Sequence, residues 1–434
     1  MIVPSIDLMN GRAVQLRGGR EVVLDGGDPL ARLEAFAVAG EVAVVDLDAA
    51  LGQGSNAELI RAMVRRAPCR VGGGIRDLAA ARAWLDAGAT RVVLGTAARP
   101  ELCAALPRER VIAAVDARRG AVVVEGWRTE TGVPVLERIR ELTPFVGGFL
   151  FTQVEHEGAM GGFDFEAVAA AARVAQGTRL TAAGGITTAQ EIAALDRIGV
   201  DAQVGMALYA GRLQLADAVA APLATPLAGG VWPTIVCDDE GRALGLAWST
   251  RASLARAVAE RRGVYWSRSR QTLWVKGETS GNTQDLLRVD LDCDRDALRF
   301  TVRQHGVGFC HLAQRACWPA EFGPADLERT IADRLAHPDP ASRTTTLLRD
   351  AGLLAAKLAE EAGELGRAET PAEVVHETAD LLYFTLVALA RGGGSLAEVR
   401  AELARRHGAV SRRPVATKPP SPFPPPPAPR THPA

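Results

Sequence analysis

The chain has 434 residues, which is too long for one ordinary domain and suits two or three. A hydrophobic fraction of 47% is enough for packed cores, and a formal net charge of −1 argues against a general nucleic-acid binder. The six cysteines are not spaced as a disulfide framework and no secretory segment opens the sequence, so we expect reduced thiols in the cytoplasm. We find no run of about 18 uncharged apolar residues and expect no membrane span.

Short apolar runs alternate with helical stretches rich in alanine, leucine and arginine through residues 1–220. Eight such βα units predict a (β/α)8 TIM barrel, to which we assign residues 1–222. The eight expected strands are 2–6, 42–46, 70–71, 91–94, 111–115, 148–152, 179–182 and 202–204.

An internal repeat supports the barrel. VGGGI at 71–75 returns as AAGGI at 182–186, and Asp7 after the first strand returns as Asp116 after the fifth. The nearly constant offset indicates two half-barrels, each with glycine-rich turns whose backbone N–H groups can bind a phosphate. Asp7 and Asp116 would face each other at the C-terminal mouth, where two carboxylates in unlike environments can serve as general acid and base.

Several motifs of this segment resemble the ProFAR isomerase of histidine biosynthesis; they are SIDLMNGRAVQL, GGDP, VVDLDAALGQGSN, VGGGIR, VVLGTAA, VDARRGAVVVEGW and AAGGI…VGMALYAG. The resemblance implies an Amadori rearrangement of an aminoaldose to an aminoketose, with Asp7 as general base, Asp116 as general acid and Thr152 nearby. It also implies two phosphate sites, one formed by Gly73, Gly74, Gly95 and Thr96 and the other by Gly184, Gly185 and Gly205.

One segment departs from that family, which usually has T-D-(I/V)-x-x-D-G-T where this chain has TQVEHEGAM at 152–160. Gln153 replaces an acid, Glu157 replaces a shorter acid and Ala159 replaces a hydroxyl. Both catalytic aspartates remain, so we expect activity. Two alternatives stay open: a decayed barrel that only binds or scaffolds, and a barrel that also isomerises phosphoribosylanthranilate. The cyclase subunit of imidazole-glycerol-phosphate synthase fits less well, because it opens with Cys-Leu-Asp.

A proline- and glycine-containing linker at 220–233 precedes a second, small α+β domain, which we assign to 231–320. It begins with a predicted hairpin whose turn lies at 238–241, followed by a helix at 253–261. Three cations that suit a phosphate follow, namely Arg268, Arg270 and Lys276.

Two interleaved metal patterns lie in this domain. Asp292, Asp294 and Asp296 alternate, so an extended strand would present all three carboxylates on one face, an arrangement that is costly without a hard cation such as magnesium. Three thiolates with a fourth position free for water form a catalytic zinc site; they are Cys293, Cys310 and Cys317.

WSRSR, KGETSG and DCDxD with the later cysteines resemble phosphoribosyl-AMP cyclohydrolase. The resemblance implies zinc on the three cysteines, magnesium on the three aspartates, and a water activated by zinc that opens the purine ring. His311 would be a proton shuttle. Because the zinc site of that family lies between two subunits, a homodimer is implied. Asn282 stands where a histidine is common, and the spacing from Cys293 to Cys310 is longer than usual.

Residues 324–408 have a helical pattern throughout, with helices starting near Pro324 and Thr344. KLAEEAGELGRA and HETADLLYF place two pairs of carboxylates on facing helices, which predicts a groove that holds magnesium. LERTIADRLAHP and TADLLYFTLVAL resemble phosphoribosyl-ATP pyrophosphatase, an all-α pyrophosphohydrolase. The resemblance implies magnesium on Glu360, Glu361, Glu364, Glu377 and Asp380, with Lys357 near phosphate.

The proline-rich segment 409–434 is predicted to be a disordered tail. The three resemblances concern consecutive steps of one pathway, so we predict a trifunctional histidine-biosynthesis enzyme that acts on phosphoribosyl nucleotides and uses Zn2+ and Mg2+. The remote alternative is a zinc-binding adaptor without enzymatic activity.

Overall fold

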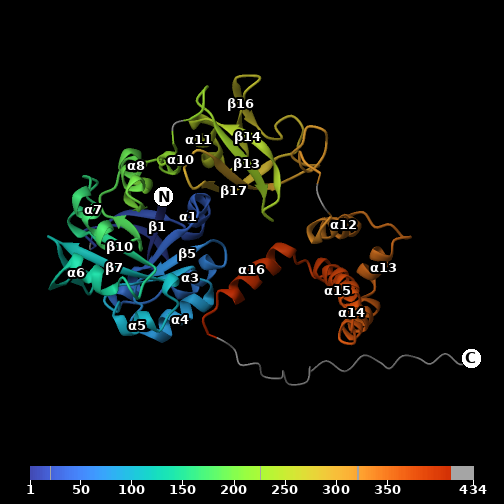
Figure 1. The fold of residues 1–434 in the computed structure, drawn as a ribbon, viewed down its shortest axis with the longest axis horizontal. Helices are drawn as coiled ribbons and strands as arrows, with labels where there is room; N and C mark the ends of the chain where they lie inside the picture. Colours follow the sequence, from blue (N-terminus) through green and yellow to red (C-terminus); the bar gives the residue numbers. More distant parts are fainter. Residues whose placement is uncertain (20, 225, 320–321, 412–434) are drawn as a thin grey trace, which may run out of the picture. The chain divides into compact units, whose positions relative to one another are not determined.

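The structure is a computed structural model that describes residues 1–19, 21–224, 226–319 and 322–411 (Figure 1). It divides into two compact units. The first comprises Met1–Trp318 with Arg405–Ser411, and the second comprises the described part of Pro319–Ala404. No described helix combines the length and the apolar character needed to cross a membrane.

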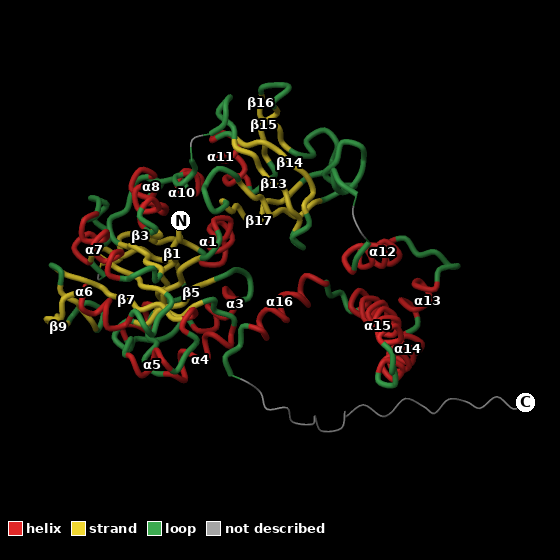
Figure 2. The backbone as a smooth tube through the Cα atoms, viewed as in Figure 1, coloured by secondary structure: helices red, strands yellow, loops and turns green. Residues whose placement is uncertain are grey.

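Eight parallel strands close into a barrel, which confirms the predicted TIM barrel and all eight predicted strands (Figure 2). The strands are almost entirely buried because side chains on one face fill the barrel and those on the other pack under helices. In barrel order they are β10 (Gly148–Gln153), β11 (Arg179–Ala183), β12 (Val200–Val204), β1 (Ile2–Met9), β4 (Val42–Asp46), β5 (Cys69–Gly72), β6 (Arg91–Leu94) and β7 (Val111–Arg118).

Helices connect the strands, and most of the longer ones begin at a residue whose side chain accepts a hydrogen bond from the first turn, as Asp77 and Thr188 do. The α-helices are α1 (Pro29–Phe36), α2 (Leu47–Leu51), α3 (Ala57–Val64), α4 (Leu78–Ala87), α5 (Pro100–Ala104), α6 (Val135–Leu142), α7 (Phe165–Val174), α8 (Ala189–Arg197), α9 (Met206–Tyr209) and α10 (Leu215–Ala220). Short 3-10 turns are η1 (Ala37–Ala39), η2 (Arg108–Arg110) and η3 (Val154–His156).

The internal repeat extends to the loops of the barrel. After β1 the chain forms the strands β2 (Arg12–Arg17) and β3 (Glu21–Gly27), and after β7 it forms β8 (Ala121–Val124) and β9 (Thr129–Pro134). Each pair is antiparallel and continues from its barrel strand. The two half-barrels therefore each carry an extra hairpin at the C-terminal end of their first strand.

The second segment of the first unit is a small sheet with strand order β14-β13-β18-β17, beside a separate hairpin and one helix. The predicted hairpin is confirmed, because the backbone N–H of Gly241 donates to the carbonyl of Asp238 at 3.0 Å. The elements are β13 (Trp232–Asp238), β14 (Ala243–Ser249), α11 (Arg251–Glu260), β15 (Val264–Ser267), β16 (Thr272–Val275), β17 (Gln284–Leu291) and β18 (Leu298–Gln304).

The barrel and the small sheet share one continuous apolar core. Buried Leu223 and Trp232 belong to the same cluster as the barrel residues Val204 and Ala218. The indole N–H of Trp232 also donates to the carbonyl of Ala224 at 3.0 Å. The segment predicted to be a linker is therefore partly buried, and it joins the two folds into one unit.

The second unit is helical, as predicted. A small core formed by Ile331, Leu347, Leu354, Phe384 and Val387 holds it together. Its helices are α12 (Pro324–Ala336), α13 (Arg343–Arg349), α14 (Ala351–Leu365), α15 (Pro371–Arg391) and α16 (Leu396–His407). The predicted starts near Pro324 and Thr344 are confirmed.

The predicted disordered tail lies outside the described residues from position 412 onward. Its first residues belong to the barrel unit, because the backbone N–H groups of Val410 and Ser411 donate to the carboxylate of Asp86 at 2.7 and 3.0 Å. The prediction of a disordered tail over residues 409–434 stays a prediction.

Candidate active sites

The barrel contains a cavity of about 770 Å³ that is lined from the C-terminal ends of its strands. Asp7 on β1, Asp116 on β7 and Thr152 on β10 all line it, as the half-barrel repeat predicts. The two phosphate cradles predicted from the resemblance also lie in its wall; their residues are Gly73, Gly74, Gly95, Thr96, Gly184, Gly185 and Gly205.

The two glycine turns are built alike and need glycine. Gly73 and Gly184 both have φ +92°. A Cβ on Gly73 would lie 2.3 Å from the carbonyl oxygen of Asp46, and one on Gly184 would lie 2.6 Å from that of Gln153. Because a side chain fits neither position, both turns present bare backbone to the cavity, as close binding of a phosphate requires.

Three partly buried carboxyl groups interact in the cavity. Burial raises the pKa of Asp7 to about 7. Burial also raises the pKa of Asp116, although hydrogen bonds from Trp127 and Thr152 oppose the shift. The pKa of Glu157 is raised to about 8 by burial and by the charges of Asp7 and Asp116. The cavity can therefore both store and release protons near neutral pH.

Two residues at this site, Glu157 and Trp127, were not among the predicted site residues. Glu157 appeared in the sequence only as a substitution in an altered motif, and Trp127 only as the end of VDARRGAVVVEGW. Trp127 Nε1 donates to Asp116 Oδ2 at 2.8 Å. Gly19 makes room for the indole, because a Cβ there would lie 2.6 Å from its ring. Neither residue has a periodic signal, so only the fold brings them to Asp116.

Gln153, the most conspicuous departure in the altered segment, has a structural role. Its Oε1 accepts the backbone N–H of Asp164 at 2.7 Å, and its Nε2 donates to the carbonyl of Asp164 at 2.8 Å. In the other half-barrel Asp46 holds Asn56 in the same way, with Asn56 Nδ2 and N donating to it at 2.8 Å each. Both pairs close the loop that precedes the next helix.

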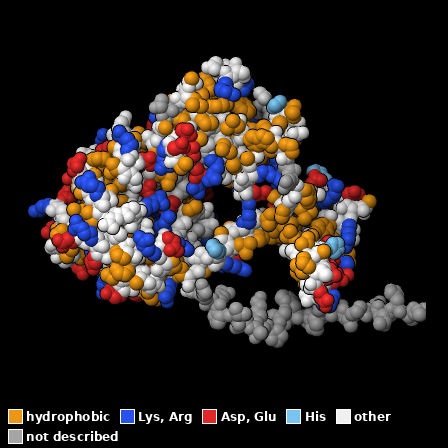
Figure 3. All heavy atoms as spheres, viewed as in Figure 1, with side chains coloured by type: hydrophobic (Ala, Val, Ile, Leu, Met, Phe, Trp, Pro, Cys, Tyr) orange, Lys and Arg blue, Asp and Glu red, His pale blue; other side chains and the backbone are white. Residues whose placement is uncertain are grey.

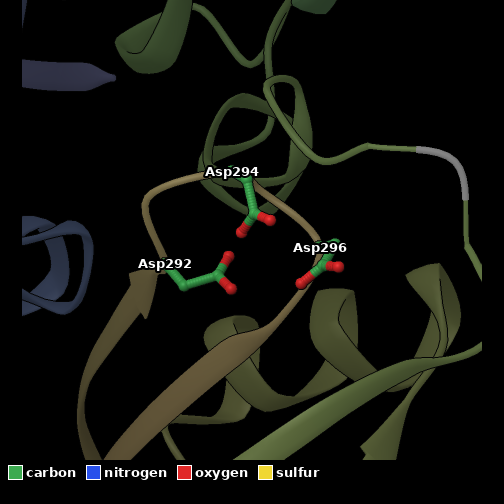
Figure 4. Close-up of side chains that lie close together, drawn as sticks. All are labelled: Asp292, Asp294 and Asp296. Carbon is green, nitrogen blue, oxygen red and sulfur yellow. The ribbon is translucent and has the colours of Figure 1, made fainter.

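The acidic triplet lies in the turn between β17 and β18 and not in a strand, so the predicted extended conformation is wrong (Figure 4). Asp292 Oδ1 accepts the backbone N–H of Ala297 at 3.0 Å and closes the turn. One oxygen from each of Asp292, Asp294 and Asp296 nevertheless lies within 4.8 Å of the others. The charges of Asp294 and Asp292 raise the pKa of Asp296, as expected for carboxylates that face one another.

Two of the three predicted zinc ligands come together. A tight turn, in which the backbone N–H of Cys310 donates to the carbonyl of Gln314 at 3.0 Å, brings Cys310 beside Cys317. Burial and then Cys310 raise the pKa of the Cys317 thiol. Cys293 is exposed in the acidic turn, and within the described residues the groups of three or more possible metal ligands contain no cysteine. The three-thiol zinc site remains a prediction.

The predicted phosphate cations of this domain occupy different places. Arg268 stacks over the ring of Trp248 at 4.1 Å, and Arg270 Nε donates to Ser267 Oγ at 3.1 Å, both in the turn between β15 and β16. Lys276 is buried, and its Nζ donates to the carbonyl of Gly308 at 3.3 Å. Lys276 therefore supports the cysteine loop, whereas the two arginines remain exposed.

In the helical unit, carboxylates from α14 and α15 converge. Oxygens of Glu361, Glu377 and Asp380 lie within 4.8 Å of one another. Burial, Asp380 and Glu364 raise the pKa of Glu361. Glu364 lies outside this group of three but is close enough to affect Glu361, and the convergence of four carboxylates stays a prediction.

Glu360 and Lys357 form a separate pair. Lys357 Nζ lies 2.7 Å from Glu360 Oε2, one turn along α14. Glu360 precedes Glu361 by one position and so projects about 100° away from it around the helix. The predicted magnesium role of Glu360 therefore has less geometric support than that of Glu361.

Three family models match the chain in succession. The histidine biosynthesis protein model matches residues 1–214, the phosphoribosyl-AMP cyclohydrolase model 245–319 and the phosphoribosyl-ATP pyrophosphohydrolase model 325–407. The histidine biosynthesis bifunctional protein HisIE of Synechocystis sp. is 42% identical over 191 residues, which are 41% of this chain and 89% of that protein. The chain belongs to the histidine biosynthesis protein family. The three resemblances predicted from the sequence are confirmed.

Longer relatives contain additional sequence. The histidine biosynthesis trifunctional protein of Saccharomyces cerevisiae is 45% identical over 192 residues, which are 44% of this chain and 24% of that protein. The bifunctional protein his7 of Schizosaccharomyces pombe is 41% identical over 202 residues, which are 46% of this chain and 48% of that protein. This histidine biosynthesis protein thus spans about a quarter of the length of the trifunctional relatives it matches.

The carboxylate groups of this histidine biosynthesis protein fit hard cations. The acidic turn and the helical unit each contain three carboxylates with an oxygen within 4.8 Å of the others. Such a cluster suits magnesium held by carboxylates, waters and substrate phosphate. The paired thiols Cys310 and Cys317 are soft ligands that suit zinc, and they need at least one further ligand.

Proposed function

We propose that this histidine biosynthesis protein catalyses three consecutive steps. Phosphoribosyl-ATP is hydrolysed to phosphoribosyl-AMP and pyrophosphate in the helical unit. The purine ring of phosphoribosyl-AMP is opened hydrolytically by the small sheet domain to give ProFAR. The barrel then isomerises ProFAR to the aminoketose PRFAR. The observation that carries the proposal is the succession of the three family matches along one chain.

In the barrel, Asp7 would act as general base and remove the proton from C2 of the opened aminoaldose. Asp116 would act as general acid and protonate the ring oxygen as the ring opens. The two groups lie in unlike environments, since Asp116 receives hydrogen bonds from Trp127 and Thr152 that orient its carboxyl group, whereas burial alone shifts the pKa of Asp7. The two glycine turns would hold the two phosphates of the substrate and fix C2 between the carboxylates.

In the small sheet domain, zinc would be held by Cys310, Cys317 and the Cys293 of a second copy, and magnesium by the acidic triplet. Zinc, when bound there, would activate the attacking water at neutral pH. His311 is exposed directly beside Cys310 and would carry the proton away from that water. Arg268 and Arg270, both exposed, would bind the phosphates of the substrate.

In the helical unit, Glu361, Glu377 and Asp380 would hold the magnesium that binds the triphosphate of phosphoribosyl-ATP. Magnesium there would activate a water for attack at the α–β phosphate bond. Glu364 would keep the local field negative, and Lys357, with Glu360 as its ion-pair partner, would neutralise phosphate charge.

We also propose that the protein is a homodimer through the small sheet domain. Hydrophobic side chains gather over the β13–β14 region in Figure 3, where Ile235 and Leu246 are 44% and 50% exposed. Leu312 lies within the cysteine turn and Trp318 directly follows Cys317, and the two are 68% and 51% exposed. Exposed apolar surface beside an incomplete thiol site is what a shared interface requires. Light scattering should give twice the mass of the 45.8 kDa chain.

Separate assays of the 434-residue chain with each of the three substrates test the proposal. We expect all three activities. Asp7→Asn should abolish only the isomerase, and Cys310→Ala only the cyclohydrolase. Cyclohydrolase activity that survives Cys310→Ala and removal of metal would contradict the zinc mechanism. Absence of all three activities in the unaltered protein would favour the adaptor alternative.

The altered segment after Thr152 is the evidence for the alternative hypothesis that the barrel only binds or scaffolds and has lost its isomerase activity. Gln153 still closes its loop, and Glu157 still lines the cavity, so the segment keeps an ordered acidic site. This geometry favours an active isomerase. An assay with phosphoribosylanthranilate separates the single-substrate from the dual-substrate barrel.

A further inference from the structure

The acidic turn of the small sheet domain has an unusual apex. Arg295 stands between Asp294 and Asp296 and has φ +66°, a left-handed conformation that residues other than glycine rarely adopt. Its neighbours are three mutually repelling carboxylates. A turn that combines backbone strain with charge repulsion needs support from outside itself.

The barrel supplies that support. Arg295 Nε donates to Asp196 Oδ2 at 3.2 Å, and Arg295 Nη2 donates to Asp196 Oδ1 at 3.1 Å, so the guanidinium binds both oxygens of a residue on α8. Its remaining nitrogen, Nη1, donates to the carbonyl of Asp292 at 2.9 Å. The backbone N–H of Ala224, which follows α10, donates to the carbonyl of Arg295 at 2.7 Å.

These contacts are shielded from solvent. The side chain of Asp196 is 13% exposed and that of Arg295 is 26% exposed, so the pair is less screened than a surface ion pair. The surrounding interface is also fixed, because α10 packs on α11, β17 packs on η1, and the apolar core is continuous between the two folds. A second ion pair, Arg261 Nη1 to Glu34 Oε2 at 3.4 Å, lies in this interface.

We propose that Asp196 of the barrel is a positioning residue for the acidic turn of the cyclohydrolase region. By holding Arg295, it keeps Asp292, Asp294 and Asp296 at the spacing that a divalent cation needs. The isomerase fold is thereby part of the cyclohydrolase site without touching its substrate. The inference rests on the proposed function of the triplet as a cation site.

Two readouts on the 434-residue chain separate this inference from the proposed function. The first is hydrogen–deuterium exchange at residues 291–298, which requires no metal. The second is binding of Mn2+, measured from the electron paramagnetic resonance of the free ion. Every protein in the binding series carries Asp380→Asn, which weakens cation binding by the helical unit to the same extent throughout the series.

The variants are Asp196→Asn, Arg295→Gly and the double variant. Glycine tolerates the positive φ, so Arg295→Gly removes the guanidinium without adding strain. Asp196→Asn would also disturb the hydrogen bond from the Met1 nitrogen to Asp196 Oδ1 (3.1 Å). Arg295→Gly leaves that hydrogen bond in place, so it isolates the effect of losing the Arg295–Asp196 pair. Glu34→Gln is the matched control, because it breaks the other ion pair of the interface.

We expect both single variants to exchange faster at residues 291–298 and to bind Mn2+ at least fivefold more weakly, with the double variant no worse than either. Glu34→Gln should change binding less than twofold, and Asp196→Asn should leave the isomerase KM unchanged. Unchanged exchange in Asp196→Asn overturns the inference. If exchange rises but the parent binds no Mn2+ at the triplet, the positioning role stands and the proposed cation site fails.

Discussion

Trp127 donates its indole N–H to Asp116 at 2.8 Å across the hairpin that follows β7. This hydrogen bond connects Asp116, a candidate catalytic residue, to the turn between β8 and β9, the extra hairpin of the second half-barrel. It also opposes the effect of burial on the pKa of Asp116. The hairpin therefore helps to orient this carboxyl group and offsets part of the effect of burial on its pKa.

Trp127→Phe removes that donor and keeps most of the ring. A hydrogen bond to a charged group contributes about 1.5–3 kcal/mol, so we expect the isomerase kcat to fall roughly 10- to 100-fold. The pKa of Asp116 should rise, moving the limb of the pH–rate profile assigned to it to higher pH. Cyclohydrolase activity is the internal control. An unchanged isomerase profile would show that the indole bond has no catalytic role.

The pKa of Asp7, raised to about 7 by burial, predicts the pH dependence of the isomerase. A general base must be unprotonated, so kcat/KM should decline as pH falls below about 7. Steady-state rates between pH 5 and 9 measure this limb. A limb near pH 4, the ordinary value for an aspartate, would argue against Asp7 as the buried base.

The same raised pKa affects stability. The folded protein binds the Asp7 proton more tightly than the unfolded chain, so its contribution to stability falls as pH rises from about 4 to about 7. Asp7→Asn removes this loss and relieves repulsion with Glu157. We expect a barrel that is more stable by about 1–3 kcal/mol at pH 8 and little changed at pH 4. Thermal unfolding at the two pH values measures the difference; equal shifts would contradict the linkage.

Gln153→Ala removes both hydrogen bonds to Asp164. Each buried bond contributes roughly 1 kcal/mol, so the free energy of unfolding should fall by about 1–3 kcal/mol. Because the loop it closes carries Glu157, the isomerase KM should also rise. Denaturant unfolding and initial rates test both effects. If Gln153→Ala is as stable and as active as the parent, Gln153 has no structural role and its departure from the family motif is neutral.

In the helical unit, two carboxylates make a matched pair of tests. Asp380→Asn weakens the three-carboxylate group, and we expect pyrophosphate release to fall by about 100-fold or more and to need more magnesium. Glu360→Gln breaks only the pair with Lys357 and should cost less than about fivefold. Pyrophosphate release during a magnesium titration separates them. Equal losses would place Glu360 among the metal ligands.

The barrel was predictable because each buried strand is a short apolar run between helical stretches, and because Asp7 and Gly73 recur as Asp116 and Gly184. The acidic turn was not predictable. Aspartates at alternate positions fit a strand, but they also fit a turn that the side chain of Asp292 closes, as in this structure. Glu157 and Trp127 reach the cavity from irregular loops that carry no period. Their roles depend on long-range packing that a single sequence does not encode locally.

The thiol site shows a second kind of limit. Cys310 and Cys317 meet through a turn that their spacing allows, whereas Cys293 lies in a different loop. Spacing identifies ligands that one turn brings together. It cannot identify ligands that a second copy of the chain would supply.

A time course with phosphoribosyl-ATP as the sole substrate tests the central claim most directly. With magnesium and zinc present, the purified 434-residue chain should release one pyrophosphate per substrate and form phosphoribosyl-AMP, ProFAR and PRFAR in that order. The Asp7→Asn variant should stop at ProFAR. If the unaltered protein also stops at ProFAR, the barrel is not an isomerase and the account of three consecutive steps is wrong.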